Sequence, residues 1–147
     1  RGWPVLPQLE EPRITFAAGS LLRAGASGAT LFWDFTPSND ATILRLTGES
    51  PSGWDFSGSR VCGFPGFSSC LDGAGGTAAS VLELRNIELV SGLRIKVDIV
   101  GVKLADIGGA AKFVLETFRE DQTGNLLAVD AGEAAMNVPG DLRVHFI

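Results

Sequence analysis

The sequence predicts an all-β domain, a sandwich of two antiparallel sheets, and three observations support this fold class. Apolar and polar residues alternate in short runs along most of the chain, which is the period of a strand with one buried face. Gly and Pro account for 19 and 7 of the 147 residues and punctuate the chain as turn signals. Helical patterning is nearly absent: residues 131–136 are compatible with one helical turn, which Pro139 and Gly140 would end.

We expect seven or eight strands, placed where the alternation is clearest. Their alternating apolar residues are Ile14 and Phe16; Leu31, Trp33 and Phe35; Leu44 and Leu46; Leu82 and Leu84; Leu93, Ile95, Val97 and Ile99; Phe113 and Leu115; Leu127 and Val129; and Leu142, Val144 and Phe146. Residues 121–125, with the sequence DQTGN, separate two of these runs and are typical of a hairpin turn. Many short strands in a single domain are typical of a two-sheet sandwich.

The predicted domain organisation has two parts, a Pro-rich arm or linker at residues 1–12 and a sandwich domain at residues 13–147. Pro4, Pro7 and Pro12 lie in the arm, and Pro cannot donate a hydrogen bond to a sheet. The chain begins with Arg1, so we expect either a removed leader or a piece of a longer chain. The last run, residues 142–147, is expected to pair within the domain, to continue into another domain or to add to a neighbour's sheet.

The charge balance argues against two classes of partner. The net charge is −5, and the twelve basic residues form no cluster, whereas binding to nucleic acid or to an anionic membrane surface requires one. No uncharged apolar run approaches the roughly 18 residues of a membrane span, so we expect no membrane insertion. The mean hydropathy is high, +0.21, which indicates a large core and some apolar surface that contacts neighbouring chains.

Cys62 and Cys70 lie in a segment rich in Gly and Ser where the alternation fails. We expect a disulfide between them, because buried free cysteines usually lie within apolar runs. Closing so short a loop stabilises the fold by about 2.5 kcal/mol in the chain-entropy model. The bond would indicate an oxidising location: the extracellular space, the cell surface or an oxidising lumen. The alternative is a pair of reduced cysteines.

Three aromatic residues lack an obvious core partner in the sequence pattern. Trp3 lies in the Pro-rich arm, and Phe64 and Phe67 lie in the cysteine loop. We predict that they bind partner chains, together with Val144 and Phe146 of the last run. The alternative for Phe64 and Phe67 is a small satellite core beneath the loop.

Residue patterns that carry catalysis or ligand binding are missing. His145, the sole histidine, is expected at the surface of the last strand, and no triad, phosphate loop or dinucleotide motif is present. We therefore expect no enzyme activity, no cofactor and no metal site. Asp34, between Trp33 and Phe35, suits a sugar site, but ordinary alternation on the polar face explains it better. Residues 120–125 are rich in oxygen ligands for calcium, yet a plain polar hairpin is the better interpretation.

The order of these features resembles an Ig-like extracellular repeat of very large surface proteins of dinoflagellates and related protists. The matching segments are Phe35-Thr36-Pro37, Pro51-Ser52-Gly53-Trp54-Asp55-Phe56, the two cysteines, Val81–Leu84, residues 93–100 and residues 113–125. The Asn-Pro step that often follows the long strand of these repeats is missing here. The resemblance implies an Ig-like sandwich used for scaffolding or surface fibres, and it assigns no catalytic residue.

The function expected from the sequence is that of a non-enzymatic structural or assembly module. It would belong to an extracellular or surface protein, a filament or a large complex, and would contact neighbouring chains through its terminal segments. The alternative is a carbohydrate-binding module, which would need exposed aromatic rings at Trp54, Phe64 and Phe67.

Overall fold

The computed structural model describes residues 10–16, 27–73, 78–106 and 108–138, and these form nine strands with no helix. The strands are β1 (Glu10–Phe16), β2 (Ala29–Thr36), β3 (Ile43–Ser50), β4 (Arg60–Cys62), β5 (Leu71–Asp72), β6 (Val81–Leu84), β7 (Ile95–Val102), β8 (Gly109–Glu120) and β9 (Leu126–Val138). The described residues include no helix that could span a membrane.

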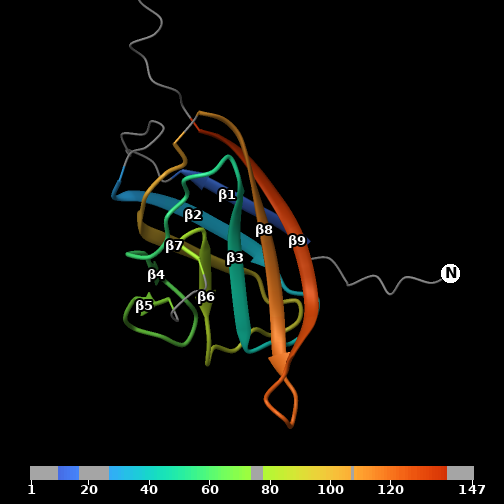
Figure 1. The fold of residues 1–147 in the computed structure, drawn as a ribbon. Helices are drawn as coiled ribbons and strands as arrows, with labels where there is room; N and C mark the ends of the chain where they lie inside the picture. Colours follow the sequence, from blue (N-terminus) through green and yellow to red (C-terminus); the bar gives the residue numbers. More distant parts are fainter. Residues whose placement is uncertain (1–9, 17–26, 74–77, 107, 139–147) are drawn as a thin grey trace, which may run out of the picture.

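The strands form two antiparallel sheets that face each other as layers (Figure 1). One sheet has the order β1-β2-β7-β4-β5, and the other has the order β6-β3-β8-β9. The first four strands of one sheet and the last three of the other correspond to the A-B-E-D and C-F-G arrangement of an Ig sandwich. The predicted Ig-like, two-sheet antiparallel sandwich is therefore confirmed.

The core lies between the two sheets and follows the predicted alternation. Trp33 on β2 pairs with Val97 on β7, and Leu46 on β3 pairs with Leu115 on β8; all four side chains are buried. Their strand neighbours on the opposite face point away from the core. The period of two in the sequence thus corresponds to one buried face in each sheet.

The segment without alternation also contributes to the core. Trp54, between β3 and β4, is buried, and its ring centroid lies 4.8 Å from that of Phe113. A Cβ atom at Gly48 would lie 2.7 Å from Cγ of Trp54, so only Gly at this position of β3 lets the indole pack against the backbone. Trp54, Phe56 and Phe64 of this segment are therefore core residues that reach the core from outside the long strands, whereas Phe67 is exposed.

Two local expectations are wrong. Residues 131–136 form no helical turn; they belong to β9, which pairs with β8 from Glu120↔Leu126 to Gly109↔Val138. The ladder with β8 outweighs the helix propensity of the alanines, because propensity is a weak term beside tertiary pairing. The long strand predicted from Leu93 begins at Ile95 instead, since Leu93 completes a turn in which its N–H donates to the Val90 carbonyl.

Candidate contact surfaces

The cysteine loop connects the two shortest strands of the structure. Cys62 ends β4, Cys70 precedes β5, and the predicted disulfide joins them. β4 and β5 contribute only the pairs Arg60↔Asp72 and Val61↔Leu71, with an ion pair of 2.9 Å between Arg60 Nε and Asp72 Oδ1. So short a ladder holds a loop poorly, and the covalent bond supplies the constraint that backbone pairing does not.

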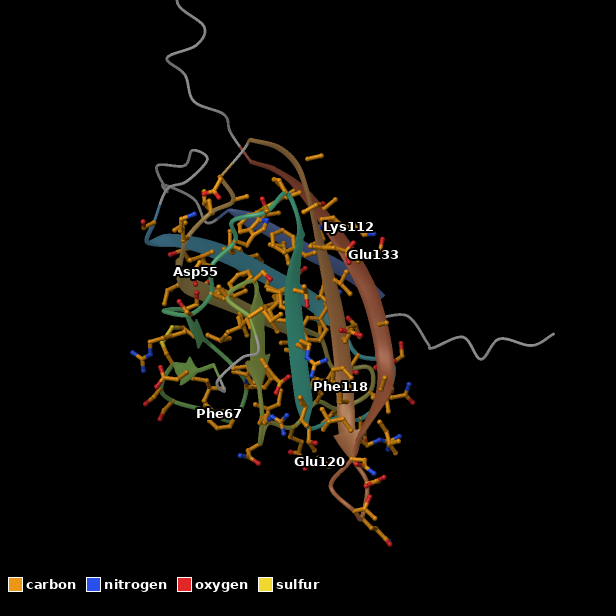
Figure 2. All side chains as sticks on the ribbon, viewed as in Figure 1. Asp55, Phe67, Lys112, Phe118, Glu120 and Glu133 are labelled. Atoms are coloured by element: carbon orange, nitrogen blue, oxygen red, sulfur yellow. A yellow bond between two sulfur atoms is a disulfide. The ribbon has the colours of Figure 1, made fainter. Side chains whose placement is uncertain are left out.

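The two phenylalanines of the loop have different environments, one buried and the other exposed. Phe64 is 1% exposed and packs in the core, whereas Phe67 is 41% exposed. Their rings meet edge to face with centroids 6.1 Å apart. Figure 2 shows Phe67 at the border of the molecule beside β5. Phe64 is therefore not available to a partner, and Phe67 is.

At one end of the sandwich the β6–β7 turn and the start of β9 are both hydrogen-bonded to the β2–β3 loop, and the three segments gather there (Figure 1). Four large apolar side chains are exposed among the described residues, and three of them belong here: Val90 at 43%, Leu93 at 53% and Leu127 at 52%. Isolated exposed apolar residues are ordinary, but several at one end of a domain are typical of a contact surface. We call these three residues the aliphatic end.

The loop between β2 and β3 holds the segments of the aliphatic end in place. Its Pro37 carbonyl accepts a hydrogen bond from Gly92 N–H, and Asp40 accepts one from Ser91 N–H. On its other side, Asn39 donates from its backbone N–H and from Nδ2 to the Asp130 carboxylate. The β6–β7 turn and β9 are thus both hydrogen-bonded to one loop, which holds the exposed side chains at the same end of the domain.

The hairpin between β8 and β9 projects beyond the aliphatic end and is polar throughout. Asp121 Oδ1 accepts hydrogen bonds from the backbone N–H groups of Thr123 and Asn125 and from the Thr123 hydroxyl. These bonds, with that of the Thr123 hydroxyl first, lower the pKa of Asp121. This carboxylate is occupied with shaping the turn, which supports the interpretation of a polar hairpin.

Asp34 occupies the outward face of β2, as its place in the alternation predicts, yet its carboxylate is covered by arginines. Oδ1 lies 3.0 Å from Arg94 Nη2 and 3.5 Å from Arg13 Nε, and the residue is 5% exposed. Trp33 and Phe35 point the other way, into the core. The rings beside Asp34 therefore provide no stacking surface for a sugar.

The outer face of β6, β3, β8 and β9 is lined by paired charges. Arg45 Nη2 lies 2.8 Å from Glu83 Oε1, and its guanidinium lies 4.5 Å from the Phe118 ring centroid. Burial raises the pKa of Glu83, but hydrogen bonds from Arg85 and Arg45 outweigh it and leave the pKa below its usual value. The charges of Arg45, Glu83 and Arg85 therefore stabilise one another.

A similar group of charges lies toward the other end of β8. Lys112 Nζ lies 3.1 Å from Glu49 Oε1 and 3.2 Å from Glu133 Oε2, and Figure 2 shows Lys112 and Glu133 close together. Hydrogen bonds to Glu49 and Glu133 raise the pKa of Lys112. Both carboxylates are paired with the single ammonium group of Lys112. The three side chains therefore form an ion-pair network.

Several predicted site residues lie outside the described residues: Trp3, Val144 and Phe146, and also His145. Within the described ranges, no three His, Cys, Asp or Glu side chains gather in a way that could hold a metal ion. The aliphatic end was missed in the sequence. Val90 and Leu93 flank the turn residues Ser91 and Gly92. Large apolar residues on both sides of a turn could have indicated the aliphatic end.

Comparison with known proteins bears on the fold. No protein-family model matches the sequence, and no curated protein does. The solved structure of BslA, a bacterial hydrophobin, matches with a TM-score of 0.60 and 14% identity, over 94% of this chain and 98% of that one. The identity is low, so this match shows a shared fold alone.

Two further solved structures match with a TM-score of 0.35, which is too low to support an argument. One is the PapD-like domain 7 of human CEP192, at 16% identity over 96% of this chain and 92% of that chain. The other is the N-terminal domain of PorA, at 15% identity over 84% of each chain.

Proposed function

We propose that this chain is a non-enzymatic structural module that works at a surface, and that its aliphatic end lies against an apolar surface. The observation that carries the proposal is the position of Val90, Leu93 and Leu127, exposed together at one end of a sandwich whose sides bear paired charges. An apolar end on a charged body makes the domain amphipathic. Transfer of that end from water to an apolar phase is favourable, at about 25 cal/mol per Å² buried.

The shared fold with a protein described as a bacterial hydrophobin supports the same proposal, because the match covers nearly all of both chains. The disulfide supports an extracellular or cell-surface location. We further propose that the chain is one Ig-like repeat of a large extracellular surface protein, as the sequence resemblance implies. Contact with neighbouring chains through residues 1–12 and 142–147 also remains a prediction, although residues 10–12 belong to β1.

The carbohydrate-binding alternative gains no support from the described aromatic residues. Trp54 and Phe64 are buried, and Phe67 is the one ring of the three predicted for sugar stacking that reaches the surface. A row of exposed rings, which the alternative requires, is not formed by these residues.

The test is adsorption at an oil–water interface, followed by drop-shape tensiometry. The double variant Leu93→Lys/Leu127→Lys replaces two side chains that are more than half exposed, so the fold should be retained within about 0.5 kcal/mol per site. We expect the wild type to lower the interfacial tension and the variant to do so much more slowly, because the charges must be desolvated at the oil surface.

The matched control is Ser68→Lys/Ala78→Lys, which adds the same two charges at exposed positions away from the aliphatic end. It should adsorb like the wild type. Equal adsorption by the wild type and the Leu93→Lys/Leu127→Lys variant would show that the aliphatic end does not mediate contact with apolar surfaces.

A further inference from the structure

The three residues of the aliphatic end lie in two different settings. Val90 and Leu93 flank a two-residue turn, whereas Leu127 lies on β9 beside the base of the polar hairpin. Figure 1 shows this hairpin extending beyond the rest of the sandwich at this end. The two settings differ in the polar groups that must lose water before the apolar side chains reach an apolar phase.

The turn between Val90 and Leu93 satisfies its own polar groups. The three backbone N–H groups and the one hydroxyl of residues 91–93 all donate within the domain: Ser91 N–H to Asp40 Oδ1 at 2.8 Å, the Ser91 hydroxyl to the Ser38 carbonyl at 2.9 Å, Gly92 N–H to the Pro37 carbonyl at 2.9 Å and Leu93 N–H to the Val90 carbonyl at 3.0 Å. Moving a polar group out of water is costly unless the group keeps a hydrogen bond. The donors of this turn can therefore leave water at little cost.

Leu127 lies among groups that resist such a transfer. Its cross-strand partner is Arg119, and both side chains are exposed. A guanidinium is always charged, and a charged group is costly to move out of water. The hairpin adds the exposed side chains of Glu120 and Gln122, and its tip extends roughly 10 Å past Leu127 at the rise of an antiparallel strand. An apolar phase that covers Leu127 must therefore desolvate charged and amide groups beside it.

The charges beside the turn indicate which kind of apolar phase fits it. Asp40 and Glu88 are both exposed, and Glu88 lies two residues before Val90. Arg94, the cation that follows the turn, is paired with Asp34 at 3.0 Å. An anionic phospholipid surface attracts clusters of Lys and Arg, whereas this turn has free carboxylates on its flanks. An uncharged apolar liquid is therefore the better match.

We propose that residues 90–93 are the part of the aliphatic end that enters an uncharged apolar liquid, while Leu127 stays at the border of the contact. This inference rests on the proposed function and deepens it, because it names the segment that enters the apolar phase and the kind of phase. Val90 and Leu93 then leave water without an unsatisfied donor between them, and the polar hairpin stays in water beside the contact.

Single lysine substitutions separate the two settings. Drop-shape tensiometry of the full chain at an alkane–water interface gives the concentration that produces half of the maximal fall in tension. Leu93→Lys should raise this concentration at least about tenfold, because the burial of a leucine is lost and a charge must be desolvated. Leu127→Lys should raise it less than about threefold, because a lysine at the border keeps its ammonium group in water. Equal effects of the two variants would overturn the inference.

Two substitutions of Asp40 test the internal hydrogen bonds of the turn. Asp40→Asn removes the charge but keeps an oxygen that accepts the Ser91 N–H, whereas Asp40→Ala removes both. Asp40→Asn should adsorb at least as well as the wild type. Asp40→Ala should need a concentration higher by about tenfold, because the Ser91 N–H would enter the alkane without an acceptor. If the two variants adsorb alike, the satisfied donors are not what lets the turn enter.

A fluorescent label reports which side chain enters the liquid. Cys62 and Cys70 are bonded, so an introduced thiol is the one that a polarity-sensitive fluorophore modifies. On alkane droplets, the label at Val90→Cys should shift its emission to shorter wavelength more than the label at Leu127→Cys. A shift at Leu127→Cys that equals or exceeds the shift at Val90→Cys would contradict the proposal.

The same labels test the kind of phase. On vesicles of anionic phospholipid the label at Val90→Cys should stay unshifted, and a shift as large as on alkane would overturn the choice of an uncharged liquid. The proposed function fails separately, if the Leu93→Lys/Leu127→Lys variant adsorbs like the wild type. Loss of adsorption shared equally by the two single variants would leave the proposed function standing and overturn this inference alone.

Discussion

Two loops of this molecule join antiparallel strands in contrasting ways. The Cys62–Cys70 loop connects β4 and β5, and residues 121–125 connect β8 and β9. Both turns contain a Gly with positive φ, Gly66 at 89° and Gly124 at 87°. Both backbones therefore adopt the left-handed conformation that favours glycine. One loop is closed by a disulfide and buries an aromatic ring, whereas the other is polar and is closed by hydrogen bonds to Asp121.

The strands on either side explain the difference. β8 and β9 have 12 and 13 residues, so their ladder fixes the ends of the hairpin and the turn needs only local hydrogen bonds. β4 and β5 have three and two residues and cannot do this. A covalent bond and a buried ring therefore hold the cysteine loop where long paired strands are missing. A loop held in this way can carry an exposed apolar side chain, Phe67, on a fixed backbone.

The largest effect should come from the buried anchor of the cysteine loop. Phe64→Ala removes a ring that is 1% exposed, and we expect the free energy of unfolding to fall by about 3–5 kcal/mol because a cavity remains. Urea denaturation measures it. Phe67→Ala is the matched control and should cost about 1 kcal/mol or less, since that ring is partly solvated. Equal losses in the two variants would contradict the division of roles between the rings.

Removal of the disulfide should have the next largest effect. The double variant Cys62→Ser/Cys70→Ser should unfold with a free energy lower by about 2.5 kcal/mol, because the unfolded chain regains the entropy of an open loop. Differential scanning calorimetry of the variant and of the wild type, with and without reductant, checks this. The reductant should lower the Tm of the wild type alone. A variant as stable as the wild type would mean that β4 and β5 need no covalent support.

The smallest effect should come from the polar hairpin and should depend on pH. The pKa of Asp121 is lowered in the folded chain from its ordinary value of 3.8, so its carboxylate stabilises the fold above that value and this contribution is lost as the pH falls through the folded pKa. We therefore expect Asp121→Ala to be less stable than the wild type at pH 7, with the difference narrowing below about pH 4. Urea denaturation at several pH values measures this.

Gln122→Ala is the control for the hairpin and should follow the wild type at every pH, because the described hydrogen bonds of the turn do not involve its side chain. A constant difference between Asp121→Ala and the wild type down to pH 2 would show that the ionised carboxylate is not what closes this turn.

Much of the sandwich was predictable because its signals are local. Alternation placed Trp33 and Phe113 in the core, and the Gly- and Ser-rich surroundings of Cys62 and Cys70 indicated the disulfide. The helical turn expected around Ala134 failed because alanine suits a helix locally, whereas the ladder with β8 is formed by residues distant in the sequence. Phe64 and Phe67 could not be separated from sequence, since both lie outside any alternating run.

The candidate contact surface was less predictable than the fold. Leu127 was assigned to a strand, which is correct, but its exposure depends on the position of that part of β9 beyond the core. Val90 and Leu93 are exposed because the β2–β3 loop fixes the turn that carries them, through the bond from Gly92 N–H to the Pro37 carbonyl. Contacts between segments more than fifty residues apart leave no periodic trace in the sequence.

The sequence by itself determined an all-β sandwich, the positions of most strands and the disulfide-closed loop, because strand period and loop composition are local properties. The tertiary structure alone decided which loop aromatic is buried, which aliphatic side chains share one end, and which strands lie at the sheet edges. Burial and edge exposure depend on how distant segments pack, and one strand's pattern is the same at the centre of a sheet and at its edge.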